Sequence, residues 1–220
     1  MLLLNKSMKK TLFAFIIVLL VACKPADKKV VEFKSQKPMN TNDTLAVATL
    51  GAGCFWCVEA VFQNLKGVKK VVSGYMGGNS ANPTYKEVCT GLSGHAEVCQ
   101  ITYNPQEISF EEILEVFWKT HDPTTLNRQG NDAGTQYRSA IFYHTEEQKV
   151  KAEFYKKEVD KSGSYSNPLV TEITKASTFY PAEDYHQNYF NQNGSEPYCR
   201  YVIQPKVEKF KKVFQQKLAK

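Results

Sequence analysis

Two cysteines that enclose two aromatic residues form the stretch of this sequence with the clearest chemical potential. Cys54 and Cys57 flank Phe55 and Trp56, directly after the glycine-rich segment Gly-Ala-Gly at 51–53. This spacing is compatible with a redox pair, with half of a zinc site, with a nucleophile beside an aromatic pocket, or with a buried corner of the fold.

Cys54 is placed to act as a nucleophile if a strand ends at Leu50 and a helix begins near Phe55. Free N–H groups and the dipole at a helix N-terminus favour a thiolate, which predicts a lowered pKa for Cys54. Phe55 and Trp56 would form an apolar cup beside the sulfur, suited to a small group such as a methyl. We interpret Glu59 as a first-turn acid that complements the dipole, or as a buried polar group.

A zinc site would need a second close pair of Cys or His. Cys89 and Cys99 are ten residues apart, and no His-x₃₋₅-His motif occurs, so we expect no metal. Each of these two cysteines is predicted to be a small buried hydrophobe. The redox interpretation stays open, although thioredoxins usually carry a proline between their cysteines.

A carboxyl group and two tyrosines could handle an oxygen atom near such a thiol. Glu97 opens a predicted strand in the segment Gly-His-Ala-Glu-Val at 94–98. In an apolar pocket its pKa would rise, and it could act as a general acid. Tyr85 and Tyr137 lie in turn-prone segments, and their hydroxyls could bind an oxygen that gains negative charge.

Five motifs together resemble the peptide methionine sulfoxide reductase family, A type. They are GCFWCVE at 53–59, GHAEV at 94–98, NDAGTQYRS at 131–139, YPAEDYHQNY at 180–189 and PYC at 197–199. The resemblance extends from about residue 44 to about residue 211. It implies an oxidoreductase that reduces the S epimer of methionine sulfoxide, free or in oxidised proteins, on a ferredoxin-like core with long coils.

The resemblance also implies roles for individual residues. Cys54 matches the nucleophile that attacks the sulfoxide sulfur, and Phe55 and Trp56 match the pocket for the substrate methyl. The groups that hold and protonate the sulfoxide oxygen correspond to Glu97, Tyr85 and Tyr137, with Asp132 in the surrounding hydrogen-bond network and Tyr198 in a C-terminal motif that reaches back to the site.

Turnover in this family passes through a sulfenic acid on the nucleophile, which a second thiol converts to a disulfide. Thioredoxin, or a thioredoxin-like exported protein, is the implied reductant, and no bound cofactor is implied. Many members carry Gly where this chain has Cys57, and a glycine-rich tail where it has Pro-Tyr-Cys-Arg at 197–200. Cys199 and Cys57 are therefore both candidate resolving thiols, with a slight preference for Cys199.

Two other functions are compatible with the same segment. A thiol–disulfide oxidoreductase would act through Cys54 and Cys57 alone, and a non-enzymatic lipoprotein would bind methionine-rich partners through Phe55 and Trp56. The oxidoreductase gives no role to Glu97, Tyr85 and Tyr137, and the binding lipoprotein does not need Cys54.

The elements that must position these residues predict an α+β fold. Their order, β-α-β-β-α-β, indicates a ferredoxin-like split βαβ sheet with long irregular loops and a C-terminal extension. Strands are expected at 45–50, 68–75, 96–103, 138–143 and 169–174, and helices at 55–66, from the Ser109 capping box to about 119, and at 145–161, with an amphipathic helix at 206–220. The segments 77–94, 120–138 and 174–205 are expected to be irregular.

The N-terminus resembles the signal of a bacterial lipoprotein. Three lysines precede an apolar run at 12–22, which ends in Leu-Val-Ala-Cys at 20–23. We expect a signal peptide at 1–22, with Met1 or Met8 as the start, lipidation at Cys23, a polar tether at 23–44 and the reductase domain at 45–220. The mature protein would be exported and anchored to a membrane, in the cell envelope or on the periplasmic side.

Charge excludes one broad class of partner. The net charge of +6 falls to +3 after Cys23, because three lysines lie in the signal and no acid does. That balance gives no support to nucleic-acid binding, and we expect a monomer.

Overall fold

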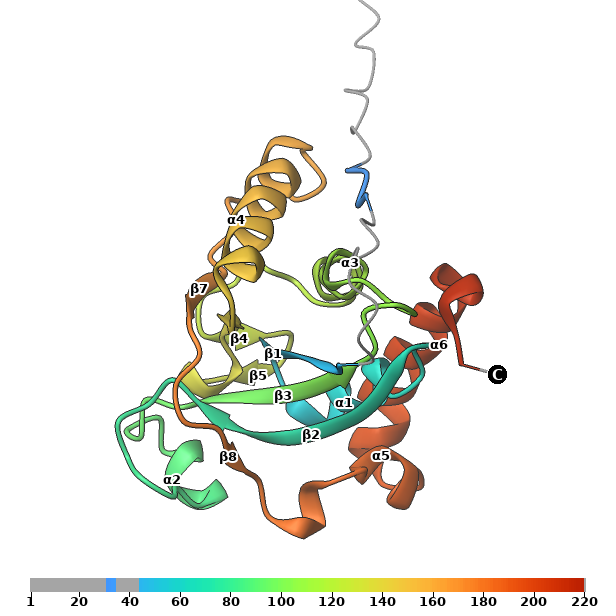
Figure 1. Ribbon diagram of the computed structural model, residues 1–220. Coiled ribbons are helices and arrows are strands. Elements are labelled where there is room, and N and C mark those ends of the chain that lie inside the picture. The colour runs from blue at the N-terminus through green and yellow to red at the C-terminus, as the bar shows by residue number, and fades with distance from the viewer. Residues whose placement is uncertain (1–30, 35–43, 220) are drawn as a thin grey trace, which may run out of the picture.

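A six-stranded mixed sheet forms the centre of the protein, seen in a computed structural model that describes residues 31–34 and 44–219 (Figure 1). The strands lie in the order β7-β6-β1-β3-β2-β8. Their bounds are β1 Ala46–Ala52, β2 Val68–Met76, β3 Ala96–Tyr103, β6 Ser139–Tyr143, β7 Glu172–Lys175 and β8 Tyr180–Pro181.

The four inner strands confirm the predicted ferredoxin-like topology. β6, β1, β3 and β2 are antiparallel neighbours, connected through α1 (Phe55–Phe62) and α3 (Phe110–Thr120). The sheet continues past this unit at both edges. α4 (Glu146–Lys161) carries the chain from β6 to the parallel strand β7, and β8 pairs antiparallel with β2.

Helices α1, α3 and α4 cover one face of the sheet and bury the main core against it. Leu50 and Ile101 contribute from the sheet, and Phe62, Phe117 and Tyr155 from the three helices. The opposite face carries a smaller buried cluster of Met76, Ala96, Val98, Ala140 and Phe142. The alternation of these residues along the strands follows from the two-residue period of a β-strand.

Capping residues set the helix starts as predicted. Ser109 and Glu112 form a reciprocal capping box at α3, and the Thr145 hydroxyl accepts from the Gln148 N–H at α4. α1 ends at Phe62, four residues earlier than expected. Beyond it Gly67 adopts φ +90°, where a Cβ would lie 2.8 Å from the Ile108 side chain.

Two of the segments expected to be irregular hold short elements. Within 77–94 lies α2 (Tyr85–Cys89), begun by a Thr84–Glu87 capping box whose sequence signal was missed. The segment 120–138 contains the hairpin of β4 (Arg128–Gln129) and β5 (Asp132–Ala133), then a 3₁₀ turn at Thr135–Tyr137. The strand expected at 169–174 begins later, as β7.

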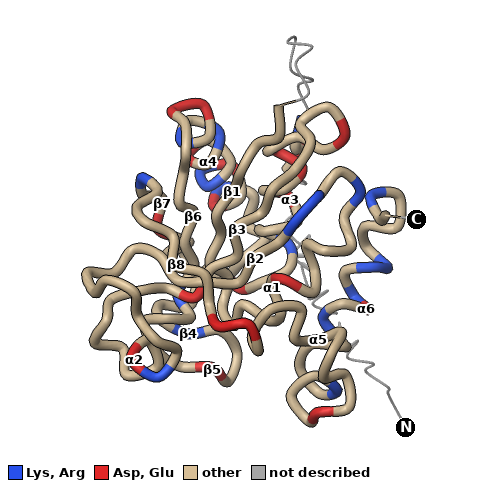
Figure 2. Tube along the Cα trace, turned by 60° about the horizontal axis from the view of Figure 1, so that its bottom comes forward, with Lys and Arg blue, Asp and Glu red and all other residues tan. Residues whose placement is uncertain are grey.

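The C-terminal part wraps around α1. It consists of a 3₁₀ turn at Asp184–His186, α5 (Tyr189–Gln192), a π-helical turn at Cys199–Ile203, α6 (Gln204–Val213) and a 3₁₀ turn at Gln215–Lys217. α6 buries Val207 and Phe210, whereas Lys209, Lys211 and Lys212 are exposed; Figure 2 marks the lysines of this helix in blue. Val213 is 56% exposed because the helix, expected to continue to residue 220, ends there and Phe214 takes the buried place.

The predicted signal peptide, Cys23 and most of the predicted tether lie outside the described residues. Of the tether, residues 31–34 and Thr44 are described, and Val31 and Phe33 pack against the domain. Within the described parts of the chain, every helix is too short or too polar to cross a membrane.

Candidate active site

Cys54 caps α1 at the point where β1 ends, as the sequence predicts. Gly53, just before it, has φ +88°, and a Cβ there would lie 2.6 Å from the Gln129 side chain. Only glycine satisfies both the conformation and the close approach of the β4 strand. The nucleophile candidate is thereby held in a tight turn between a central strand and a helix.

The thiol of Cys54 differs from the prediction in its ionisation. Burial raises its pKa well above the ordinary value, and the neighbouring Cys57 and Glu97 add to the rise, while a hydrogen bond with Tyr198 opposes it. The first free helix N–H, of Phe55, donates to Glu97 Oε2 at 3.0 Å. The prediction of a thiolate was wrong for two reasons. The sulfur is buried, and the helix N-terminal N–H donates to the Glu97 carboxyl instead of to the Cys54 sulfur.

Glu97 confirms its predicted character. It is 1% exposed on β3, and burial raises its pKa to about 8, although the Phe55 N–H lowers it. Asp132 and Cys57 add further negative potential. The carboxyl is therefore predominantly neutral at pH 7, able to donate a proton.

Tyr85 and Tyr137 converge on this carboxyl from separate loops. Burial raises the pKa of both hydroxyls, and the charge of Glu97 raises both further. Tyr85 opens α2, and its backbone N–H donates to Glu183 Oε1 at 2.8 Å. Tyr137 ends the 3₁₀ turn after β5. Both hydroxyls remain protonated donors at any physiological pH.

Tyr198 and Asp132 join the C-terminal segment to the same centre. The Tyr198 hydroxyl donates to Asp132 Oδ2 at 2.6 Å, and it also lies within hydrogen-bonding reach of the Cys54 and Cys57 thiols. Burial raises the pKa of this hydroxyl too. The predicted C-terminal motif thus reaches the nucleophile candidate.

An aromatic cup lies beside Cys54, built from more residues than the sequence assigned. Phe55 is 1% exposed, and Trp56 stacks on Tyr189 with ring centroids 3.7 Å apart and planes 7° apart. Trp56 Nε1 donates to His186 Nδ1 at 3.2 Å, and the His186 ring lies 4.4 Å from that of Tyr85. His186 and Tyr189 lie in the motif at 180–189, but were not singled out within it.

Glu59 turns out to be a buried polar group rather than an exposed acid of the first turn. It is 2% exposed, and burial raises its pKa. Hydrogen bonds from the backbone of Asn188 and Tyr189 oppose that rise. The carboxyl therefore connects α1 to the start of α5.

The described cysteines, Cys54, Cys57, Cys89, Cys99 and Cys199, are all free thiols. A hydrogen bond from Cys54 lowers the pKa of Cys57 to about 7. Cys99 is buried, as predicted, with its thiol 3.4 Å from the Phe55 carbonyl. Cys89 is exposed, against prediction, because α2 turns Val88 inward instead.

Residues 31–34 and 44–219 contain no group of three or more His, Cys, Asp or Glu side chains arranged to hold a metal ion. The chemistry of the described site consists of thiols, a neutral carboxyl and tyrosine hydroxyls.

Comparison with known proteins agrees with this arrangement. The family model described as peptide methionine sulfoxide reductase matches residues 46–218. The chain is 57% identical to the enzyme MsrA of that name from Leptospira borgpetersenii, over 75% of this chain and 93% of the relative. It is 55% identical to that of Saccharolobus solfataricus, over 79% and 97%.

Solved structures are similar as well. Mxr1 from Saccharomyces cerevisiae in its reduced form superposes with a TM-score of 0.65 at 34% identity, covering 70% of this chain and 89% of that one. Methionine sulfoxide reductase A of Corynebacterium diphtheriae gives a TM-score of 0.61 at 34% identity, covering 70% and 77%.

Proposed function

The chain belongs to the peptide methionine sulfoxide reductase family, and from this premise we propose how its residues divide the reaction: Cys54 attacks, Glu97 protonates and Cys57 resolves. The reaction is the reduction of methionine-(S)-sulfoxide to methionine by thiols. The observation that carries the assignment is the neutral, buried carboxyl of Glu97 next to the Cys54 thiol.

In the first step the Cys54 sulfur bonds to the sulfoxide sulfur as the sulfoxide oxygen is protonated. Collapse of that adduct releases methionine and leaves the oxygen on Cys54 as a sulfenic acid. The substrate sulfur is reduced by two electrons, and the Cys54 sulfur is oxidised by two.

Glu97 moves the protons of this step. Its Oε2 accepts the Phe55 N–H, which leaves Oε1 as the atom that holds the proton. The carboxyl gives that proton to the sulfoxide oxygen and regains one from the Cys54 thiol, so it returns to its starting state. A raised thiol pKa suits this circuit, because the thiol loses its proton only when a substrate is present to accept one at its oxygen.

Tyr85 and Tyr137 position the sulfoxide oxygen toward Glu97. Their half-buried hydroxyls donate hydrogen bonds where negative charge develops during attack. Phe55 and Trp56 receive the substrate methyl. Removal of one such donor in other enzymes costs about 2.7–4 kcal/mol of transition-state stabilisation.

Cys57 resolves the sulfenic acid in this proposal. It lies one helical turn from Cys54 and shares a hydrogen bond with it. The hydrogen bond with Cys54 lowers the pKa of Cys57 and favours its thiolate, the form that attacks sulfur. The thiolate bonds to the Cys54 sulfur and closes a Cys54–Cys57 disulfide, and the sulfenic oxygen leaves as water after it takes up one proton from solvent.

Cys199 then takes part in a second exchange. Its thiol is buried in the π-helical turn at Cys199–Ile203. Burial raises the pKa of Cys199, and the negative charge of Cys57 raises it further. Exchange with Cys57 would release the Cys54 thiol for the next substrate. A thioredoxin-like dithiol finally reduces the enzyme disulfide and becomes oxidised itself.

We propose a place of action from the N-terminal sequence. The lipobox-like segment at 20–23 supports export, cleavage after residue 22 and lipidation of Cys23, with the domain held at a membrane in the cell envelope. Oxidised proteins and free methionine-S-sulfoxide would be the substrates there, and we propose that the enzyme works as a monomer.

One experiment decides the resolving step. The enzyme is incubated with one equivalent of methionine-(S)-sulfoxide and no reductant, then alkylated and analysed by mass spectrometry. We expect Cys54 joined to Cys57 at early times, followed by Cys57 joined to Cys199. A Cys54–Cys199 bond as the earliest product would exclude Cys57 as the first partner.

A Cys57→Ser variant provides the kinetic counterpart. It should still release one methionine per enzyme at the wild-type rate, whereas turnover with thioredoxin should fall by about tenfold or more. Disulfide reduction in insulin at a comparable rate, without any sulfoxide, would instead favour a thiol–disulfide oxidoreductase.

A further inference from the structure

A short segment upstream of β1 lies on the helical face of the domain. In residues 31–34, Val31 and Phe33 are partly buried against the main core, whereas Glu32 and Lys34 are exposed. An extended segment that lies flat on a surface turns alternate side chains inward. The pattern marks residues 31–34 as a docked segment within the region expected to be a plain tether.

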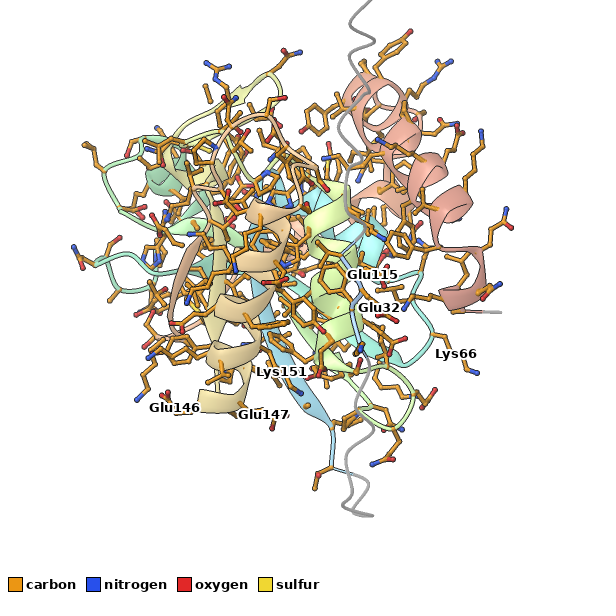
Figure 3. The ribbon with its side chains drawn as sticks, turned by 90° about the horizontal axis from the view of Figure 1, so that it is seen from above. Glu32, Lys66, Glu115, Glu146, Glu147 and Lys151 are labelled. Carbon is orange, nitrogen blue, oxygen red and sulfur yellow. The ribbon has the colours of Figure 1, made fainter. Side chains whose placement is uncertain are left out.

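Tyr155 of α4 holds this segment in two ways. The Phe33 ring stacks on the Tyr155 ring with centroids 4.4 Å apart and planes 15° apart. The Lys34 N–H donates to the Tyr155 hydroxyl at 3.0 Å. Glu32 and Lys34 line a groove with side chains of α3 and α4 that include Glu111 and Lys151, and Figure 3 shows Glu32 and Lys151 on this face.

This groove lies at the opposite end of the sheet from the active site. Glu111 and Lys151 influence the pKa of Tyr103, which ends β3 and pairs with Ala46 at the start of β1. Glu97 occupies the other end of β3, six residues away, or about 20 Å at about 3.4 Å per residue. Figure 1 shows the segment beside α3 and α4, with α2 and α5 of the active site on the far side.

Docking shortens the reach between Cys23 and the domain. From Cys23 to Val31 the chain can span at most about 28 Å, whereas from Cys23 to Thr44 it could span about 74 Å. A domain of this size is about 40 Å across. A connection shorter than the domain's diameter cannot bring the opposite side of the domain, which carries the active site, back to the anchor. A connection of about 74 Å can.

We propose that residues 31–34 form a strap that turns the active site away from the membrane to which Cys23 is attached. The proposal rests on the lipid anchor proposed above. It assigns the enzyme to methionine sulfoxides on proteins in the aqueous compartment, in preference to those held close to the bilayer surface that carries it.

Amide exchange on the full-length lipidated protein in phosphatidylcholine vesicles tests the strap itself. We expect the Lys34 amide to exchange at least about ten times more slowly than an unstructured amide. Tyr155→Phe, which removes only the acceptor, and Phe33→Ser, which removes the stacked ring, should each abolish this protection. Glu32→Ser, with its side chain already in solvent, is the matched control and should retain it. An unprotected Lys34 amide in the wild type would overturn the strap.

Reach is tested on the same vesicles, with a methionine-(S)-sulfoxide peptide coupled to the lipid through spacers of about 10 Å or about 80 Å. The wild type should reduce the long-spacer peptide at least about fivefold faster than the short-spacer peptide. Phe33→Ser should raise the short-spacer rate to the long-spacer rate, and Glu32→Ser should change neither. Equal rates for both spacers in the wild type would overturn the orientation.

Two readouts separate this proposal from its premises. Free methionine-S-sulfoxide reports the catalytic proposal, and its reduction should be the same in the wild type, Phe33→Ser and Glu32→Ser. Incorporation of labelled palmitate reports the anchor at Cys23. A protein without the label would lack the lipid anchor and would therefore overturn the proposed orientation. Exchange of the Lys34 amide would still show whether residues 31–34 are docked.

Discussion

Two buried glutamates at opposite ends of the molecule show how one residue type serves chemistry in one place and structure in another. Glu97 is 1% exposed and Glu111 3%. Glu97 receives one backbone N–H and lies near the acidic groups Asp132 and Cys57. Glu111 Oε1 lies 2.8 Å from Lys151 Nζ, and this ion pair ties α3 to α4.

The difference lies in the partner and not in the depth of burial. Without a cation, the desolvated carboxyl of Glu97 keeps its proton, and its pKa of about 8 makes it an acid that is ready to donate at neutral pH. Lys151 supplies the missing charge at the other end. Although burial lowers its pKa, hydrogen bonds with Glu111 and Glu147 raise it, so the ammonium stays charged. Among the residues that the structure describes, the buried carboxyl of Glu97 has no ion-pair partner, whereas that of Glu111 is paired with Lys151.

The largest expected effect belongs to the catalytic end. Cys54→Ser should reduce the rate of methionine-(S)-sulfoxide reduction by on the order of 10³-fold or more, because a hydroxyl cannot form the sulfenic acid. Cys89→Ser is the control: its hydroxyl can keep the hydrogen bond that this exposed thiol on α2 shares with Tyr85, and it should act at the wild-type rate. Retained activity in Cys54→Ser would remove the mechanism proposed for this end.

Glu97→Gln comes next, and it tests the acid role through the pH profile. The amide cannot donate an acidic proton, so the first step should slow by about 10²-fold at pH 7. In the wild type the rate of this step should fall as the pH rises through about 8, where Glu97 ionises. Single-turnover kinetics between pH 6 and 9.5 measure both. An alkaline limb that persists in Glu97→Gln would assign it to another group.

Sequence reasoning predicted the scaffold and the positions of the residues at the catalytic end better than it predicted their protonation states. Periodicity and the Ser109 cap give the ferredoxin-like core because strands and helices there obey local rules. The ionisation of Cys54 could not be predicted, since it depends on burial and on Glu97 taking the Phe55 N–H across the fold. The contacts of His186 are equally non-local, since its partner Trp56 lies 130 residues away.

The far end was predicted least, for a related reason. Residues 31–34 are a weak pattern in a polar region, and only the aromatic surface of Tyr155 makes them a docked segment. The missed helix α2 is different, because Thr84 and Glu87 already carried a capping signal. The sequence therefore contained enough information for α2, but not for the strap.

The same Glu97→Gln variant should be more stable than the wild type at high pH, although its catalytic defect is expected at neutral pH. A raised pKa means that the folded state binds more protons than the unfolded state between about 4.5 and 8, so wild-type stability falls as the pH rises through that window. The neutral amide avoids this loss. We expect Glu97→Gln to unfold at similar urea concentrations at pH 6, and to be more stable by about 2 kcal/mol at pH 9. Equal stability of the two proteins at pH 9 would mean that ionisation of Glu97 does not destabilise the folded state.

The smallest expected effect lies at the far end, where the comparison predicts lost stability with unchanged catalysis. Lys151→Met keeps the alkyl chain but leaves Glu111 buried without its cation, which should lower the free energy of unfolding by about 1–2 kcal/mol at pH 7. Lys149→Met removes a looser pair, 3.9 Å from Glu146 at the surface, and should cost less than about 0.5 kcal/mol.

Adding Glu111→Gln to Lys151→Met distinguishes the cost of leaving the Glu111 charge uncompensated from the cost of changing the Lys151 side chain itself. Because the uncompensated charge is the costly element, the double variant should recover most of the loss, which urea unfolding measures as a coupling free energy. The reductase rate on free methionine-S-sulfoxide should stay at the wild-type value in all three variants. If Lys151→Met slowed the first step, the two ends would be coupled, and the division between unpaired acids for chemistry and paired acids for structure would fail.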